Sequence, residues 1–362
     1  MLTRATSIMF AGCAIVAVLL IAACNSDGDS EPQTSGPARP FLMGFSSLPR
    51  ELNAEAYADT FDLAAENGEM VLIHRTPPWA EFLPGADVSE GTARTTASEK
   101  DAIDDKDLKL FFAIDPTDGS TNRDRLGELP PSLAGRGFGD PDVQAAFISY
   151  AEYVTLNYRP DVLALGVEMN LYYEKNEDDF ENFRNLYDAA YDAVKEIAPE
   201  TQVTVTFQYE DLQGLLPRED RHFADWQLLR TFEPKLDLVA ISTYPSFAFA
   251  SAAAIPDNYY RQLRAFTDLP IAIAEMGFSS AAAPQGLNSG TEEDQTRFLA
   301  FALREAEAMS MPFVVWFAGW DPTYAQHTAF AAFQHIGLLR DDDTEKPAWA
   351  EWVEAARRPY EP

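Results

Sequence analysis

Two glutamates lie where apolar runs end, a place where a carboxylate needs an explanation. Glu168 lies in LALGVEMN (163–170), and Glu275 lies in IAIAEMGFS (271–279). A buried strand end rarely tolerates an unpaired charge, so a carboxylate there indicates a side chain that reaches into a site. Two carboxylates in one site can take acid and base roles when their surroundings push their pKa values apart. Glu168 and Glu275 are therefore the candidate catalytic pair.

The elements that must position this pair are short apolar runs rich in Val, Ile, Leu and Phe, separated by longer amphipathic segments. They are FLMGFSS (41–47), MVLIHR (70–75), LKLFFAID (108–115), VLALGVE (162–168), QVTVTFQ (202–208), LDLVAIST (236–243), PIAIAE (270–275) and PFVVWFA (312–318). Runs that are apolar on both faces are typical of parallel strands covered by helices. The pattern predicts eight strands.

The segments between these runs carry helix signals. One stops at Gly68, another stops before Pro199, and a third begins at Thr291, a candidate N-cap followed by acidic residues. Eight alternations of strand and helix predict an α/β fold, a single TIM (β/α)8 barrel. The alternative, an open doubly wound sheet, would show a Gly-rich phosphate loop after its first strand, and FSSLPREL is not one.

The N-terminal residues predict export. Residues 1–23 contain one Arg and an apolar stretch from Ile8 to Ala23, shorter than the roughly 20 residues that span a bilayer, which is typical of a signal peptide. The tetrad ending at Cys24 resembles the bacterial lipobox, which implies acylation of Cys24; a plain signal peptide with an incidental Cys is the alternative. Asn25 favours the outer membrane among bacterial envelope locations, by resemblance to bacterial sorting signals.

Residues 24–40 are polar and rich in Pro, Gly and Ser, so they predict a flexible linker between the lipid and a folded domain at 41–362. The only cysteines are Cys13 and Cys24, so the domain depends on a large core and not on disulfides. A net charge of −31 disfavours nucleic acid and anionic polymers as partners, although it also serves solubility. We expect a monomer that contacts the membrane through its lipid only.

In a TIM barrel the active site lies at the carboxyl ends of the strands. Polar and aromatic residues stand at these predicted ends: Ser46 and Ser47, His74 and Arg75, Asp115, Glu168 with Asn170, Gln208 with Tyr209, Tyr244, Glu275, and Trp316 with Trp320 and Asp321. The set predicts a polar, aromatic site at one end of the barrel.

This constellation resembles the retaining glycoside hydrolases of the large (β/α)8 clan, in which the acid/base Glu ends strand four and the nucleophile Glu ends strand seven. The resemblance covers residues 41–355 and implies these roles for Glu168 and Glu275. The tail GLLRDDDTEKPAWAEW is similar to the closing segment of arabinogalactan endo-β-1,4-galactanases and related endo-β-mannanases. It implies an endo-acting enzyme that cleaves a neutral β-linked polysaccharide or oligosaccharide by double displacement, with the two carboxyl groups about 5 to 5.5 Å apart.

The resemblance also implies roles for neighbouring residues. Arg75 and Tyr244 match by strand position the Arg and Tyr that assist the nucleophile. Trp316 would be the sugar platform, because pyranose C–H faces pack on indole. Further subsite candidates are Trp79, Tyr172, Tyr173, Phe247 and Trp320.

One position departs from the clan. Most members carry an Asn immediately before the acid/base Glu, where this chain has Val167, and Asn170 is the candidate substitute. An Asn-Glu pair at Asn176 and Glu177 lies in a charged segment and not at a strand end, and we interpret it as a chance match to the motif.

Several of the candidate site residues also have an interpretation in which they serve the structure and not the function. Either glutamate could serve a structural salt bridge, Arg75 could be a counter-ion, and Trp316 could be a core aromatic. For His74 and Asp115 the structural interpretation is the favoured one. The four histidines, at 74, 222, 327 and 335, show no ligand spacing, so we expect no catalytic metal and no cofactor.

Two other functions fit the same residues. A non-catalytic cell-surface glycan-binding lipoprotein is suggested by Val167. A transglycosylase would use the same two glutamates.

Overall fold

In the computed structural model the described residues are 36–119, 123–216, 223–282 and 290–362. The chain divides into two units, Met1–Gln33 and Thr34–Pro362, and every described residue belongs to the second. The predicted signal peptide (1–23), Cys24 and linker residues 24–35 lie outside the described residues. Among the described helices, none combines the length and apolar character needed to cross a bilayer.

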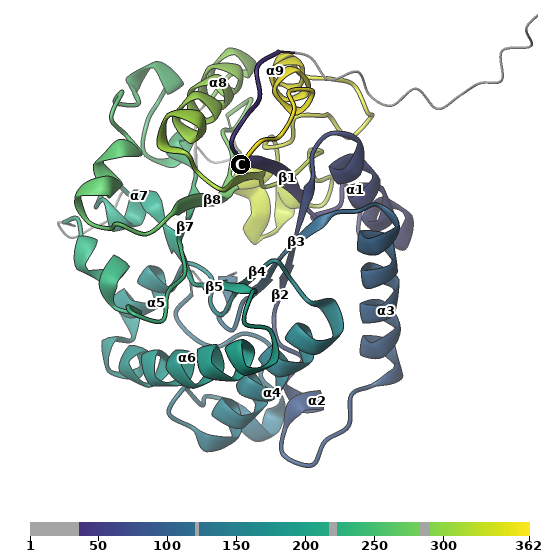
Figure 1. Ribbon diagram of the computed structural model, residues 1–362, viewed down its shortest axis with the longest axis vertical. Helices are drawn as coiled ribbons and strands as arrows, with labels where there is room; N and C mark the ends of the chain where they lie inside the picture. The colour runs from purple at the N-terminus through teal and green to yellow at the C-terminus, as the bar shows by residue number, and fades with distance from the viewer. Residues whose placement is uncertain (1–35, 120–122, 217–222, 283–289) are drawn as a thin grey trace, which may run out of the picture. The chain divides into compact units, whose positions relative to one another are not determined.

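The described strands form one parallel sheet that is rolled into a nearly closed barrel (Figure 1). They are β1 Leu42–Ser46, β2 Met70–Arg75, β3 Lys109–Ile114, β4 Val162–Ala164, β5 Gln202–Thr204, β6 Thr206–Gln208, β7 Val239–Thr243, β8 Ile271–Met276 and β9 Phe313–Trp316. Their order is β5-β4-β3-β2-β1-β9-β8-β7-β6, with every pairing parallel. The predicted single TIM barrel is confirmed.

Nine strands appear where eight were predicted because the fifth run, 202–208, is divided at Val205. Its first half, β5, pairs with β4, and its second half, β6, pairs with β7. The backbone N–H of Thr206 also donates to the Gly166 carbonyl at 3.0 Å, and the Thr204 hydroxyl donates to the Leu238 carbonyl at 2.8 Å. The fifth run therefore joins both edges of the sheet, and β8 is the seventh strand of the barrel.

Helices surround the strands in Figure 1. The α-helices are α1 Ala54–Glu66, α2 Trp79–Phe82, α3 Glu90–Asp105, α4 Pro141–Tyr158, α5 Met169–Lys175, α6 Glu177–Ile197, α7 Tyr209–Leu212, α8 Glu292–Met309 and α9 Pro347–Ala356. Short 3-10 helices are η2 Pro131–Leu133, η3 Trp226–Arg230, η4 Pro245–Phe247, η5 Ala252–Ala254, η6 Arg261–Ala265, η8 Ala325–His327 and η9 Ala329–Phe333. Thr291 caps α8 as predicted, since its hydroxyl accepts from the Asp294 N–H at 3.1 Å.

The barrel interior is packed with small and medium apolar side chains. They are Met70, Leu72, Phe111, Ala113, Val162, Ala164, Val167, Leu238, Ala240, Ala272, Ala274, Phe313 and Val315. The rings of Phe111 and Phe313 cross this interior with centroids 5.5 Å apart. The barrel interior is thus a solid core and not a channel.

Candidate active site

A cavity of about 730 Å³ opens at the carboxyl ends of the strands. Of the predicted site residues, it brings together Glu168, Glu275, Arg75 and Tyr244. Its other lining side chains include Ser46, Ser47, Leu48, Pro49, Tyr57, His74, Asp115, Asp118, Arg123, Glu128, Phe317, Phe330 and Phe333. Residues from both halves of the chain therefore converge on one chamber.

Glu168 follows β4 in a left-handed backbone conformation, with φ of 50° and ψ of 45°. That conformation costs a non-glycine residue about 1 to 2 kcal/mol, and here the Glu168 N–H is fixed by the Thr206 hydroxyl at 2.8 Å. The carboxylate accepts from the Ser242 hydroxyl at 2.5 Å and from the Arg123 Nε at 2.9 Å. The turn thus directs the side chain into the cavity, where two donors hold it.

Glu275 reaches the cavity because β8 is irregular. The β7–β8 register pairs Ile241 with Ile273 but Ser242 with Glu275, so one extra residue is inserted. Ala274 faces the barrel interior, so regular alternation would place the next residue, Glu275, on the outer face. The bulge turns the Glu275 side chain inward instead. Its side chain is only 6% exposed.

Two donors meet the Glu275 carboxylate. The Tyr244 hydroxyl donates to Oε2 at 2.8 Å, and the His74 Nδ1 lies 3.4 Å from Oε1. Burial and the charge of Glu275 raise the pKa of Tyr244 well above its usual value, so the phenol stays a neutral donor. The two contacts hold the Glu275 carboxylate in place from opposite oxygens.

His74, Asp115 and Arg123 form a buried group beside the glutamates. His74 Nε2 lies 2.9 Å from an Asp115 oxygen, and the Arg123 NH1 lies 2.7 Å from each oxygen of Asp115. Burial opposes protonation of His74, but its contacts with Asp115 and Glu275 outweigh it and raise the pKa of His74 to about 10. Burial would raise the pKa of Asp115, but Arg123 and His74 hold it well below its usual range.

Arg75 does not reach Glu275, in contrast to the predicted contact. Its guanidinium binds both oxygens of Glu99 on α3, at 2.6 and 3.1 Å, and lies 3.1 Å from the Tyr158 hydroxyl. Successive residues of a strand point in opposite directions, so only one of the two neighbours at the end of β2 reaches Glu275. That residue is His74, and Arg75, at the cavity wall, serves as the counter-ion of Glu99.

Trp316 is a core residue and not the predicted sugar platform. It is fully buried, its indole N–H donates to the Ile336 carbonyl at 2.9 Å, and its ring packs on Phe298 of α8. The next residue, Phe317, faces the cavity, with its ring 5.8 Å from that of Tyr244. Adjacent residues of a strand face opposite sides, so an error of one residue selects a side chain on the wrong face. The strand was predicted correctly, but the residue that faces the cavity was not.

Asn170 and Tyr172 are buried at a distance from the chemistry. The Asn170 amide bonds the Gln208 N–H and carbonyl at 2.8 and 3.0 Å and an Asp211 oxygen at 2.7 Å. The Tyr172 hydroxyl donates to Asp179 at 2.6 Å. Neither side chain is among the described residues that line the cavity. Asn170 therefore does not supply the amide that most clan members carry at the position of Val167.

The two remaining predicted tryptophans also lie outside the lining. Trp79 is buried, and its indole N–H donates to the Gly127 carbonyl at 2.8 Å. Trp320 donates to Asp343 at 2.9 Å and packs under the Arg50 guanidinium. Trp79 supports the cavity wall indirectly, because Gly127 belongs to that wall.

A buried carboxylate missed in the sequence supports Tyr244. Glu210 is fully buried and accepts from the Thr243 hydroxyl at 2.7 Å, the Tyr244 N–H at 3.0 Å, the Tyr259 hydroxyl at 2.7 Å and the Gln208 amide at 2.7 Å. Burial raises the pKa of Glu210. Its four donors fix the backbone from which the Tyr244 ring reaches Glu275.

Other contributors were also missed. Arg123, Phe330 and Phe333 lie on connecting segments, where hydrophobic periodicity carries no signal. Their only trace in the sequence is position: Arg123 follows a predicted strand end by a short polar loop. Among the described residues, no group of three or more His, Cys, Asp and Glu side chains is arranged to hold a metal ion.

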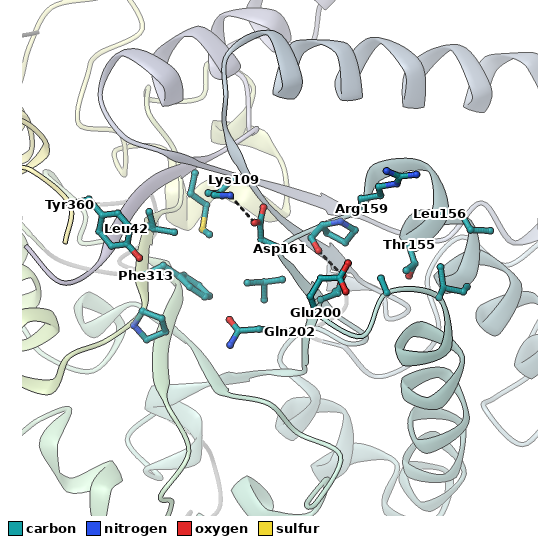
Figure 2. A pocket seen from close by; sticks show the side chains of 17 residues that line it. Leu42, Lys109, Thr155, Leu156, Arg159, Asp161, Glu200, Gln202, Phe313 and Tyr360 are labelled. Carbon is teal, nitrogen blue, oxygen red and sulfur yellow. Dashed lines mark hydrogen bonds and ion pairs between the residues drawn. The ribbon is translucent and has the colours of Figure 1, made fainter. Parts of the chain in front are cut away.

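A second pocket, of about 580 Å³, lies at the opposite, amino ends of the strands (Figure 2). Leu42, Phe313 and Tyr360 form one side of it, and Lys109 and Asp161 point toward each other across it, 3.2 Å apart. It contains no member of the predicted catalytic pair.

No protein-family model matches the chain, and no curated protein sequence matches it either. Solved structures do match. The chain is 18% identical to exo-beta-1,4-mannosidase Op5Man5 from Opitutaceae bacterium strain TAV5, with a TM-score of 0.65 over 91% of this chain and 62% of that one. The chain thus spans less than two thirds of that protein's length.

Two further structures share the fold. A GH5_18 variant from Streptomyces cattleya in complex with Manb1-4GlcNAc is 17% identical, with a TM-score of 0.65 over 88% of this chain and 80% of that one. A family 17 β-1,3-glucanosyltransferase from Rhizomucor miehei is 13% identical, with a TM-score of 0.55 over 85% and 96%. At these identities the likeness shows the fold, and it confirms the predicted resemblance to the glycoside hydrolase barrels at that level.

Proposed function

We propose that this protein is a retaining glycoside hydrolase in which Glu168 is the acid/base and Glu275 the nucleophile. The observation that carries the proposal is the convergence of these two carboxylates, from the fourth and seventh barrel strands, on one cavity at the carboxyl ends. The fold shared with known glycosidases supports it.

The reaction follows from the partners of each carboxylate. Glu275, held in place by Tyr244 and His74, attacks the anomeric carbon as the bond to the leaving oxygen breaks and Glu168 donates its proton to that oxygen. Glu168 then takes a proton from water, and that water displaces Glu275 from the glycosyl ester. The predicted separation of about 5 to 5.5 Å between the two carboxyl groups fits this route.

Glu168 must stay in place through both steps. Ser242 and Arg123 donate to its carboxylate and hold it in the cavity, where it can give a proton to the leaving oxygen and then take one from water.

The cavity lining supports a neutral saccharide as substrate. Carboxylates outnumber cations along its wall, which disfavours uronic or sulfated sugars. Apolar side chains on the wall, Leu48, Pro49, Phe317, Phe330 and Phe333, offer surfaces for the C–H faces of a pyranose. Because the structural neighbours include a β-mannosidase and a β-1,3-glucanosyltransferase, β-mannans and β-glucans lead the substrate panel, followed by galactan and xylan.

The similarity of the closing segment to endo-acting enzymes supports internal cleavage of a polymer. Product analysis tests this directly, because internal cleavage lowers viscosity early whereas terminal cleavage releases only small sugars. The acylation of Cys24, and with it attachment of a monomeric catalytic domain to the bacterial envelope, belongs to the same proposal. Cys24→Ala is expected to release or stall the protein, and a wild type that is wholly soluble after secretion would contradict it.

The test of function is reducing-sugar release by the secreted protein on this panel, with Glu275→Gln as the inactive variant. Glu177→Gln is the matched control, because Glu177 follows an Asn but lies outside the cavity lining. Wild-type activity that survives in Glu275→Gln would refute the assignment. Binding without release would indicate a glycan-binding protein, and longer oligosaccharides a transglycosylase.

A further inference from the structure

A continuous chain of contacts connects the two catalytic carboxylates. From Glu275 it runs to His74 Nδ1 at 3.4 Å, and from His74 Nε2 to Asp115 at 2.9 Å. From Asp115 it runs to the Arg123 NH1 at 2.7 Å, and from the Arg123 Nε to Glu168 at 2.9 Å. Asp115 and Arg123 are almost fully buried, 5% and 6% exposed, so water screens these links little.

We propose that Asp115 is a positioning residue that joins the two catalytic carboxylates into one electrostatic unit, by holding His74 as an imidazolium against Glu275 and Arg123 against Glu168. The proposal rests on the proposed function for its catalytic consequence. Its structural claim, the protonation of His74 by two facing carboxylates, does not depend on any substrate.

The geometry requires a doubly protonated His74. A neutral imidazole has one donor and one acceptor nitrogen, and here both nitrogens face carboxylate oxygens, which only accept. An acceptor nitrogen turned to either carboxylate would be repelled, so both nitrogens carry protons. The raised pKa of His74, about 10, agrees with this arrangement.

The same reasoning applies to the arginine. One guanidinium lies between two carboxylates, with NH1 on both oxygens of Asp115 and Nε on Glu168. Asp115 therefore takes up part of the Arg123 charge. Without that partner the full charge of Arg123 would act on Glu168 alone.

The other charged groups of the cavity leave Asp115 as the shared partner. Thr117 donates to it from N–H and hydroxyl, at 3.2 and 3.0 Å, and adds no charge. Arg75 is paired with Glu99 on the outer side of β2, and the loop after β3 adds the carboxylates of Asp118 and Glu128 to the wall. Tyr244 faces the far side of Glu275 as a neutral donor.

Asp115→Asn removes the charge and nearly keeps the shape. His74 then loses a counter-charge, so its pKa falls from about 10. This change moves the alkaline limb of the kcat/KM profile to lower pH, by about one unit or more. At neutral pH kcat/KM falls on the order of 10- to 100-fold, and least for substrates with good leaving groups.

The decisive measurement is NMR of the full-length protein with 15N-labelled histidine. The chain has four histidines, and His74→Gln identifies the signal of His74. We expect the wild-type His74 to carry both N–H protons at pH 8 and to lose one only near pH 10. In Asp115→Asn the same transition is expected at least one unit lower.

Asp161→Asn is the matched control. Asp161 accepts from the Leu110 N–H at the amino end of β3 and pairs with Lys109, so it occupies the opposite end of the strand that leads to Asp115. The titration of His74 should be unchanged in this variant. If Asp115→Asn fails to fold, the wild-type titration still decides.

A neutral His74 at pH 8 in the wild type would overturn the proposal, and so would an unchanged titration in folded Asp115→Asn. These outcomes are distinct from a failure of the proposed function. A protonated His74 in a protein that hydrolyses no glycoside would keep the electrostatic unit and reject the hydrolase, and a neutral His74 in an active enzyme would do the reverse.

Discussion

The two ends of the barrel are built from the same parallel strands and differ in how their charges are arranged. At the amino ends the pocket of about 580 Å³ holds Lys109 and Asp161, which are 54% and 41% exposed and pair mainly with each other. At the carboxyl ends the cavity of about 730 Å³ holds five titratable groups linked in series, the two glutamates and the three residues between them. An exposed ion pair contributes little, whereas buried linked charges shift one another's pKa values.

Left-handed backbone occurs at both ends of the strands, for example at Arg159 beside the amino-end pocket and at Glu168 beside the carboxyl-end cavity. At the carboxyl ends, the left-handed Glu168 and the bulge in β8 each turn a carboxylate toward the cavity. Departures from regular geometry persist only where surrounding contacts hold them, and they concentrate at functional sites. The comparison teaches that neither volume nor left-handed backbone alone identifies a site in this molecule, whereas linked buried charges do.

The largest expected effect is that of Glu275→Ala at the carboxyl ends. Without the nucleophile no glycosyl ester forms, so kcat should fall by about 10⁴-fold or more on every substrate. Added azide should then yield a glycosyl azide of inverted configuration, because it attacks from the vacated face. NMR of the early products measures the configuration, and a retained product would exchange the two roles.

Glu168→Ala should follow, with a loss of about 10² to 10⁴ on natural substrates. An aryl glycoside with a low-pKa phenol needs little proton donation, so it should still form the glycosyl-enzyme. Azide should speed the breakdown of this intermediate to a product of retained configuration. Wild-type turnover of a natural substrate by this variant would show that Glu168 is not the acid.

Two adjacent residues at the end of β9, Trp316 and Phe317, allow a core residue to be compared with a residue of the cavity wall. Trp316→Ala empties a fully buried site and should lower the free energy of unfolding by about 3 to 5 kcal/mol, while the folded fraction keeps most of its kcat/KM. Phe317→Ala should cost less stability but lower kcat/KM about tenfold through lost sugar contact. Thermal unfolding and kinetics of both variants separate these effects, and the reverse pattern would restore Trp316 as the platform.

The charged unit should also appear in the pH dependence of stability. The folded pKa of His74, about 10, lies above its ordinary value of 6.5, so its contribution is full below pH 6.5 and is lost as pH rises through 10. The Tm of the wild type should therefore fall more steeply over this range than the Tm of His74→Gln. Parallel slopes for the two proteins would mean that His74 gains nothing from its carboxylate partners on folding.

The smallest effect is expected at the amino ends. Lys109→Met removes a partly exposed ion pair, which is worth about 0 to 1 kcal/mol, and lies far from the chemistry. Denaturant unfolding should show a change within that range, and kcat/KM should be unchanged. A large loss of activity would break the distinction between the two ends.

The sequence predicted the barrel because its evidence is local and repeated: apolar runs of strand length, helix caps and stops, and polar residues after each run. It also predicted Glu168 and Glu275, since a carboxylate at the end of a buried run is conspicuous. Tyr244, chosen by strand position, does lie beside Glu275 in the structure.

The errors at Arg75 and Trp316 have one physical origin, the phase of each strand relative to the cavity. At the ends of β2 and β9 the residue in the expected role was adjacent to the one predicted: His74 and not Arg75 contacts Glu275, and Phe317 and not Trp316 lines the cavity. Phase depends on the tilt and register of neighbouring strands, which no single run reveals. Arg123 lies on a loop whose course only the whole fold determines.

The left-handed backbone at Glu168 bears on how this protein could change over evolutionary time. Glycine adopts that conformation freely, so Glu168→Gly should be more stable than Glu168→Ala by about 1 kcal/mol, although both lack the same carboxylate. A single codon change to glycine would thus relieve the backbone strain at position 168 but abolish the proposed reaction. The difference in Tm between the two variants would measure the stability that the glutamate costs at this backbone position, a cost that its chemistry must outweigh.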